Sequence, residues 1–322
     1  WYPNAKAFVD YRVLFDTLGR DIDAVVVSTP DHTHAPASML AMEVGKPVYC
    51  QKPLTHHVSE ARAMRKYAED HKLITQMGIQ CQSSDEYRKA VALIQGGIIG
   101  KVSTVRAWSP KNWGFDGPAP KGSDPAPETL NWNLWLGTSP ERPYKEGYYH
   151  PGKWRKLLDY GCGTLGDMGV HIFDTPYTAL GLDVPKTIRT KCRKPTGFGH
   201  PENNVVTYEF PGTEYTARNL KWVWYDGPGA PDEHKDLKLP GGEELPGQGA
   251  MFIGEKGSLL LPHWDYPKLI VNGKYEAISD PELEEDFSNL KQNEAKHYHQ
   301  FVDACLGKDT CSASFTYAAR LT

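Results

Sequence analysis

Asp167 and His171 are the residues of this sequence whose types and spacing most directly predict chemistry. They are four positions apart, so on a helix both side chains leave the same face one turn apart. A carboxylate and an imidazole are then aimed at one point, and an imidazole has a pKa suited to accepting a proton near neutrality. Three other interpretations stay open: Asp167 as a helix N-cap, His171 as a hydrogen-bonded core histidine, and the pair as zinc ligands, although no third ligand is evident.

The stretch around this pair, residues 159–174, is rich in glycine, which lets the backbone approach another group closely. Gly161, Gly163 and Gly166 spell the dinucleotide-binding fingerprint, but we reject that interpretation. The fingerprint requires a buried strand before it and a free helix N-terminus after it. Residues 154–160 do not have the pattern of a buried strand. Asp167 would also place a negative charge where the phosphate should lie.

The elements that must position such residues begin with a helix whose apolar positions are 11, 14, 15 and 18 and which Gly19 ends. Residues 23–28 form a β-branched run expected of a strand buried on both faces. Further strands are expected at 47–50 and 73–77, with helices over 34–44 and 58–68 between them. This alternation predicts a doubly wound parallel sheet, whose ligands bind beyond the carboxyl ends of the strands.

Three loops should line that crevice: residues 29–34, 51–53 and 78–82. Lys52 lies in the second of them, directly before a proline, and the proline favours an extended backbone there. Its ammonium group should therefore lie at the carboxyl end of a strand. The alternative is an ordinary solvated surface lysine.

The second half of the chain has a different pattern. A helix is expected at 85–95 and a late one at 295–306, with strands between them that fit an open, mainly antiparallel sheet. These strands are expected at residues 101–108, 187–192, 204–210, 213–224, 258–261 and 268–271. We therefore expect two domains, a partial doubly wound domain over 1–83 and a second domain over 84–322; the resemblance described below implies dinucleotide binding for the first and substrate binding and oligomerisation for the second. Residues 227–249 form the longest loop, which predicts a lid or a mobile segment.

The composition excludes several classes of partner. The 322 residues are 39% hydrophobic and 24% charged with a net charge of -4, so neither nucleic acid nor an anionic membrane is an expected partner. No apolar run approaches the roughly 18–20 residues of a membrane span. The six cysteines form no C-x-x-C pair, which argues against a disulfide framework and a structural zinc site. The compartment stays open: cytoplasmic by default, or periplasmic if an export signal preceded Trp1.

Three motifs in order resemble the Gfo/Idh/MocA oxidoreductases, the family of glucose–fructose oxidoreductase and inositol dehydrogenase. They are Ser28–His34, Gln51-Lys52-Pro53 and Gly161–Asp174. The resemblance implies a Rossmann domain that binds NAD or NADP. It also implies a second α/β domain, built on a large open sheet, that closes over a sugar or cyclitol and mediates homodimer or homotetramer contacts.

The sequence departs from the family pattern at two places. Gln51 replaces the usual glutamate, which removes one charge near the nicotinamide but keeps hydrogen-bonding capacity. Family members also begin with a strand, a glycine-rich phosphate loop and a ribose-selecting residue, and this sequence enters after them. We expect that an N-terminal segment of the natural protein precedes residue 1; the alternative is a chain that binds dinucleotide poorly.

The resemblance also implies roles for individual residues. Lys52 would lie beside the substrate hydroxyl and stabilise developing alkoxide charge, His171 would act as the base, and Asp167 would orient the His171 ring or bind a neighbouring hydroxyl. The residues expected at the cofactor are Thr29, Pro30, His34, Gln51 and Gln80. Trp154 and Arg155 would pack on the nicotinamide or clamp the sugar; packing within the loop is the alternative.

The resulting hypothesis is an NAD(P)-dependent oxidoreductase that transfers a hydride to or from a ring carbon of a sugar or cyclitol. Two alternatives stay open. One is an NAD-dependent glycosidase that acts by transient oxidation and elimination, with a glycan on the aromatic-rich residues 108–149. The other is a non-catalytic sugar-binding relative.

Overall fold

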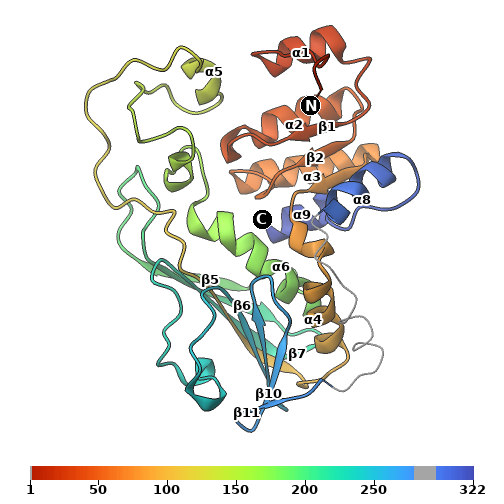
Figure 1. Cartoon of the computed structure of the whole chain (residues 1–322), viewed down its shortest axis with the longest axis vertical. Coiled ribbons are helices and arrows are strands. Elements are labelled where there is room, and N and C mark those ends of the chain that lie inside the picture. Colours follow the sequence, from red (N-terminus) through yellow and green to blue (C-terminus); the bar gives the residue numbers. More distant parts are fainter. Residues whose placement is uncertain (1, 279–294) are drawn as a thin grey trace.

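A computed structural model describes residues 2–278 and 295–322 of the chain. Two parts pack against one another, with the first at the top of Figure 1 and the second below it. The first part has a parallel sheet in the order β1 (Val25–Val27), β2 (Val48–Cys50), β3 (Thr75–Met77). Its helices are α1 (Tyr11–Leu18), α2 (His34–Glu43) and α3 (Val58–His71). The predicted alternation of strands and helices is confirmed.

One detail of this sheet differs from the prediction. All three residues of β2 are buried, but Val26 in β1 is 64% exposed, so the expectation of a strand covered on both faces is wrong for β1. β1 lies at the edge of the described sheet, and α1, which has no buried residue, does not cover it.

The end of the chain returns to this first part. Ala313, Phe315 and Ala318 share a core with Val27, Cys50 and Met77, and the Met77 amide donates to the Ala313 carbonyl at 2.8 Å. Phe315 and Ala318 belong to α9 (Phe315–Leu321), and α8 (Ala295–Cys305) precedes it; both are drawn in blue in Figure 1. The domain limits of 1–83 and 84–322 stay a prediction, and the packing adds the last residues to the first core.

The second part is built on an eight-stranded sheet within the described residues, in the order β11-β10-β9-β8-β4-β7-β6-β5. All neighbours are antiparallel except β4 and β7, which confirms the predicted large, mainly antiparallel sheet. Its strands are β4 (Val102–Ser109), β5 (Thr187–Cys192), β6 (Asn204–Pro211), β7 (Thr216–Asp226), β8 (Gly249–Gly254), β9 (Ser258–Pro262), β10 (Lys268–Val271) and β11 (Lys274–Glu276). The sequence analysis missed β8, which glycines bound at both ends, and the three-residue β11.

Different elements cover the two faces of this sheet. On one face, α4 (Asp85–Gln95) and α6 (Val170–Ala179) bury residues such as Leu93 and Ile172 in the largest core. On the other face, Leu237 and Leu239 pack with Trp108 and Tyr225. These two leucines belong to residues 227–249, so apolar side chains anchor part of this segment on the sheet, and the expectation of a lid or a mobile segment stays a prediction.

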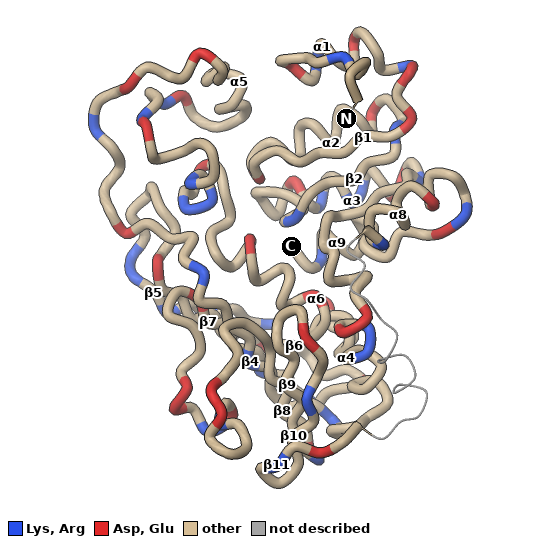
Figure 2. The backbone as a smooth tube through the Cα atoms, viewed as in Figure 1, with Lys and Arg blue, Asp and Glu red and all other residues tan. Residues whose placement is uncertain are grey.

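Residues 109–157 form a long connection that contains α5 (Trp132–Leu136) and a 3-10 turn at Lys153–Lys156. Its aromatic residues pack on one another into a satellite core, in which Trp132 and Trp135 stack with ring centroids 4.9 Å apart. Figure 2 shows acidic and basic residues interspersed along the described backbone of both parts. Among the described residues, no helix has the length and apolar character needed to cross a membrane.

Candidate active site

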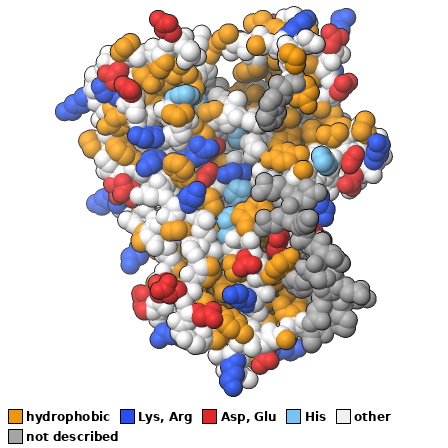
Figure 3. Space-filling model, viewed as in Figure 1, with side chains coloured by type: hydrophobic (Ala, Val, Ile, Leu, Met, Phe, Trp, Pro, Cys, Tyr) orange, Lys and Arg blue, Asp and Glu red, His pale blue; other side chains and the backbone are white. Residues whose placement is uncertain are grey.

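Lys52 and Asp167, which are 115 residues apart in sequence, meet where the two parts of the molecule join. The Lys52 Nζ donates to the Asp167 carbonyl oxygen at 2.7 Å and to its Oδ1 at 2.8 Å. Their side chains are 17% and 14% exposed, so the ion pair is sheltered but reachable. Figure 3 shows Lys, Arg and His side chains gathered at mid-height, between the part that holds β1–β3 and the large sheet below.

Asp167 lies in a π-helical turn, Leu165–Gly169, that leads directly into α6. The sequence predicted an α-helical spacing, whereas π-turns have wider i→i+5 bonds, are rare and occur frequently at functional sites. Gly166 is required in this turn because an added Cβ would lie 2.1 Å from the Cβ of Cys162. A 3-10 turn rather than a strand precedes the glycines, in keeping with our rejection of the dinucleotide fingerprint.

Arg155 joins the cluster from the 3-10 turn. Its Nε donates to Asp167 Oδ1 at 3.3 Å, and its guanidinium lies over the rings of Trp154 at 4.2 Å and Trp113 at 5.6 Å. Burial works to raise the pKa of Asp167, but the charges of Lys52 and Arg155 outweigh it and lower that pKa. Asp167 therefore stays ionised at neutral pH and holds the ammonium in place.

His171 occupies the first turn of α6, one turn beyond Asp167. Its Nδ1 lies 3.3 Å from Cys81 Sγ, and its ring centroid is 5.9 Å from that of His263. The Asp167 carboxylate is engaged by Lys52 and Arg155, so within the described residues the partner of the His171 ring is Cys81. Burial, reinforced by the positive charge of Lys52, lowers the pKa of His171 well below its usual value. The imidazole is therefore neutral at pH 7, the form that accepts a proton.

The structure adds residues that the sequence analysis did not single out. Cys81 lies in the predicted crevice loop 78–82, so its position in that loop was an available signal. His263 directly follows β9, and its Nδ1 lies 2.5 Å from the Tyr87 hydroxyl. Lys111 is exposed nearby, and its charge acts on both histidines. Nothing in the local sequence marks His263 or Lys111.

Asp31 is a further buried carboxyl beside the site. Its Oδ2 accepts a hydrogen bond from the Cys162 amide at 3.1 Å. Burial raises its pKa to about 7, against the opposing effect of Lys52. Asp174 is separate from this cluster, since it accepts from the Tyr317 hydroxyl at 2.6 Å and is buried between α6 and α9.

The residues expected at the cofactor fall into two groups. Thr29 is exposed at the end of β1, and Pro30 follows it. His34 is only 1% exposed, and its ring nitrogens lie 2.8 Å and 2.9 Å from the carbonyl oxygens of Thr29 and Pro53. His34 thus braces two crevice loops against each other and presents no free ring atom to a ligand.

The side chains of Gln51 and Gln80 have different partners in the structure. The Gln51 side chain folds over Gly78, where an added Cβ would lie 2.6 Å from its Oε1, so the Gln51 amide occupies the space that a larger residue would need. Gln80 instead donates to the Tyr298 hydroxyl at 2.9 Å, toward α8. The structure brings Gln51 beside Lys52, whereas the Gln80 amide is engaged with α8.

Trp154 and Arg155 also have different surroundings. Trp154 is buried in the aromatic satellite core, and its indole donates to the Pro151 carbonyl at 3.1 Å. Arg155 reaches the ion pair, as described above.

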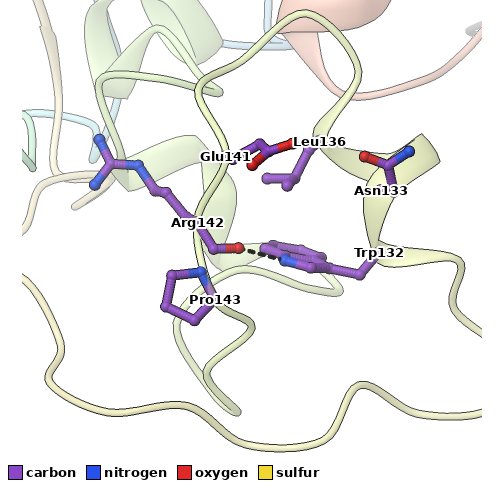
Figure 4. A pocket seen from close by; sticks show the side chains of 6 residues that line it. All are labelled: Trp132, Asn133, Leu136, Glu141, Arg142 and Pro143. Carbon is purple, nitrogen blue, oxygen red and sulfur yellow. Dashed lines mark hydrogen bonds between the residues drawn. The ribbon is translucent and has the colours of Figure 1, made fainter.

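A separate open hollow of about 440 Å³ lies beside α5, lined by Trp132, Asn133, Leu136, Glu141, Arg142 and Pro143 (Figure 4). Within the described residues, no group of three or more His, Cys, Asp and Glu could hold a metal ion.

Comparison with known proteins agrees with this geometry. Residues 2–79 match the family model for the NAD-binding Rossmann fold of the oxidoreductase family GFO_IDH_MocA, and residues 86–203 match the model for its C-terminal α/β domain. Together these matches cover more than half of the chain. The chain belongs to the Gfo/Idh/MocA oxidoreductase family.

Curated members of this family include two informative relatives. Levoglucosan dehydrogenase of Pseudarthrobacter phenanthrenivorans is 26% identical, over 82% of this chain and 74% of the relative. The scyllo-inositol 2-dehydrogenase (NAD(+)) of Bacillus subtilis is 35% identical, over 78% of this chain and 57% of the relative. For most of the curated relatives, the alignment spans less than two thirds of the relative's length.

Solved structures share the fold at lower identity. Levoglucosan dehydrogenase in complex with NADH superposes with a TM-score of 0.60 at 18% identity, covering 98% of this chain and 78% of the other. The described residues fit the nicotinamide end of the family's cofactor: Thr29 is exposed at one strand end, and Gln51 and Lys52 follow the next.

Proposed function

We propose that the protein oxidises a ring hydroxyl of a sugar or cyclitol, or reduces the corresponding ketone, with NAD or NADP as the hydride carrier. The observation that carries the proposal is the meeting of Lys52 with the Asp167–His171 segment at the carboxyl end of β2. The matched relatives, named for levoglucosan and inositol, support a cyclic polyol as the substrate class.

Lys52 would bind the substrate oxygen. Two of its three N–H bonds point to Asp167. The third has no partner within the described part of the chain and is left for a ligand. A fixed ammonium stabilises the negative charge that develops on the oxygen when its carbon is oxidised. Asp167 holds the ammonium in this position, and Arg155 keeps the cluster net positive.

His171 would take the hydroxyl proton. Its Nδ1 faces Cys81, so Nε2 is the nitrogen left for the substrate. Because the imidazole is neutral at pH 7, it can accept the proton without first losing one. The nicotinamide, when bound, supplies the hydride chemistry; the residues of this chain position the carbinol and move its proton.

The test measures NADH or NADPH formation by the full-length protein on a panel of cyclitols and anhydro-sugars. Lys52→Met and His171→Leu are each expected to lower kcat/KM by roughly 10²–10⁴-fold, the range for a lost acid–base or electrostatic group. Retained NAD binding in a direct titration shows that the variants are folded. Wild-type rates in both variants would refute the assignment.

The same assay distinguishes the two alternatives. Cleavage of a glycoside without net NADH would replace the dehydrogenase with the NAD-dependent glycosidase. Failure of the full-length wild type to bind NAD would favour the non-catalytic relative.

We also infer that the protein is a homodimer or homotetramer associated through the open sheet. Every residue of β5 at its edge is exposed, including Ile188 at 59%. An exposed strand edge and a large exposed apolar residue favour association. Light scattering after size-exclusion chromatography tests this, and a monomer at micromolar concentration would contradict it.

A further inference from the structure

His263 and Tyr87 form a hydrogen-bonded pair beside His171. The Tyr87 hydroxyl lies 2.5 Å from Nδ1 of His263, and the Trp264 backbone amide donates to the same hydroxyl oxygen at 3.1 Å. Tyr87 is buried, so its hydroxyl depends on these partners. The Trp264 amide takes one lone pair of the hydroxyl oxygen, and Cys81 is a further side-chain partner of Tyr87.

The direction of this hydrogen bond would set the tautomer of His263, and we take the Tyr87 hydroxyl as the donor. An Nδ1 that accepts a hydrogen bond carries no proton, so in the neutral ring the proton is on Nε2. Burial, with the charges of Lys111 and Lys52, lowers the pKa of His263 to about 4, so the ring is neutral at physiological pH. No described residue hydrogen-bonds to Nε2, and the ring is partly exposed.

His263 lies close to the catalytic groups. The ring centroid of His263 is 5.9 Å from that of His171, and the charge of Lys52 acts on both imidazoles. The two histidines have different partners at Nδ1, the Cys81 thiol for His171 and the Tyr87 phenol for His263. His171 serves as a base when its Nδ1–H donates to the sulfur and leaves Nε2 unprotonated, and His263 serves as a donor when its Nδ1 accepts from the phenol.

We propose that His263 is a substrate-binding residue whose Nε2–H donates to a ring hydroxyl of the polyol other than the one oxidised, with Tyr87 as the positioning residue that fixes its tautomer. This inference rests on the proposed function and deepens it. Since a donor held by a buried partner discriminates against a ligand that lacks the matching oxygen, His263 would select among polyols.

The first test does not depend on activity. Long-range proton–nitrogen NMR of the isotope-labelled full-length protein is expected to show the Nε2–H tautomer for His263, and Tyr87→Phe is expected to reduce its population. A His263 ring that is protonated on Nδ1 in the wild type would overturn the proposal.

The second test uses monodeoxy analogues of the best substrate. His263→Leu is expected to lower kcat/KM roughly two- to tenfold, mainly through KM, as for one lost neutral hydrogen bond. On the one analogue that lacks the contacted hydroxyl, the same substitution should have no further effect. His263→Gln, whose amide can place a donor near Nε2, should restore part of the loss.

His71→Leu is the matched control, because His71 is exposed at the end of α3 and its ring lies near the Tyr67 carbonyl. It should leave the kinetics unchanged. Equal losses for His263→Leu on every analogue would overturn the proposal. A wild type that turns over no polyol would refute the proposed function as well, whereas active wild type with an unaffected His263→Leu would refute this inference alone.

Discussion

Two clusters of similar chemistry lie on opposite faces of the large sheet, and they differ in what they leave unsatisfied. On the helix-covered face, Lys52 pairs with Asp167 and keeps one N–H without a partner among the described residues. On the other face, Arg106 of β4 donates to Asp236 at 2.9 Å and to the Tyr225 hydroxyl at 2.5 Å. Its third nitrogen lies 2.8 Å from His234 Nε2.

The comparison distinguishes a candidate catalytic site from a cluster whose role is structural. Arg106 is 7% exposed, and its partner Asp236 belongs to the segment that carries Leu237 onto the sheet, so this cluster holds residues 227–249 in place. The Lys52 side chain is more exposed than that of Arg106, 17% against 8%, and it has a spare donor. Residue types and ion pairing alone would not tell the two apart; the unsatisfied donors and their exposure do.

The largest expected effect comes from Asp167→Asn. The substitution removes the charge that holds Lys52, so kcat/KM should fall by roughly 10²-fold or more. The free energy of unfolding should change little, since asparagine keeps the backbone carbonyl and a side-chain amide oxygen as acceptors for Lys52. Steady-state kinetics and urea denaturation measure the two quantities. A loss of stability without a loss of rate would show that the Asp167 carboxylate has a structural role instead of a catalytic one.

Arg106→Leu should do the opposite. It leaves Asp236 and the Tyr225 hydroxyl without their partner, and we expect the free energy of unfolding to fall by about 1–3 kcal/mol. The rate constant of the folded protein should stay within a few-fold of wild type. Lys221→Ala on neighbouring β7 is the surface control, with an expected change within about 0.5 kcal/mol. An unchanged denaturation midpoint for Arg106→Leu would show that the Arg106 cluster does not stabilise the fold.

The pH dependence of its protonation tests the role of base assigned to His171. Its pKa is lowered, so the neutral, proton-accepting form persists below the usual histidine pKa of about 6.5 and is lost only at more acidic pH. Lys111→Ala removes one of the charges that lower this pKa, so the transition should move slightly upward. NMR titration of His171 measures it directly, because the Asp31 carboxyl titrates near pH 7 and adds its own limb to a rate profile. A transition at or above pH 6.5 in the wild type would contradict the assignment.

The smallest expected effect is that of Gly78→Ala. The new Cβ would lie 2.6 Å from Gln51 Oε1, so the flexible end of that side chain must move away from the strand ends. We expect a rise of a few-fold in the KM for the cofactor with kcat nearly unchanged. Gly45→Ala provides the contrast: its Cβ would meet nothing within 4 Å but its φ of +75° is strained, so it should affect stability rather than KM.

The sequence determined the parts that depend on local pattern. Helices such as α4 and strands such as β10 follow from the spacing of apolar residues, and Lys52 is placed at a strand end by the strand before it and Pro53 after it. Family motifs supplied Asp167 and His171. These inferences succeed because apolar periodicity and backbone restriction are properties of short segments.

The tertiary structure decided which of these residues face one another. The Asp167 carboxylate pairs with Lys52 and Arg155 rather than with His171, whose partner is Cys81, and the π-turn that sets this geometry has no local signature. His263 follows an ordinary strand, and only the packing of β9 against α4 brings it beside Tyr87. Contacts between segments about 90–180 residues apart depend on how two sheets and their helices pack, and no short stretch of sequence records that.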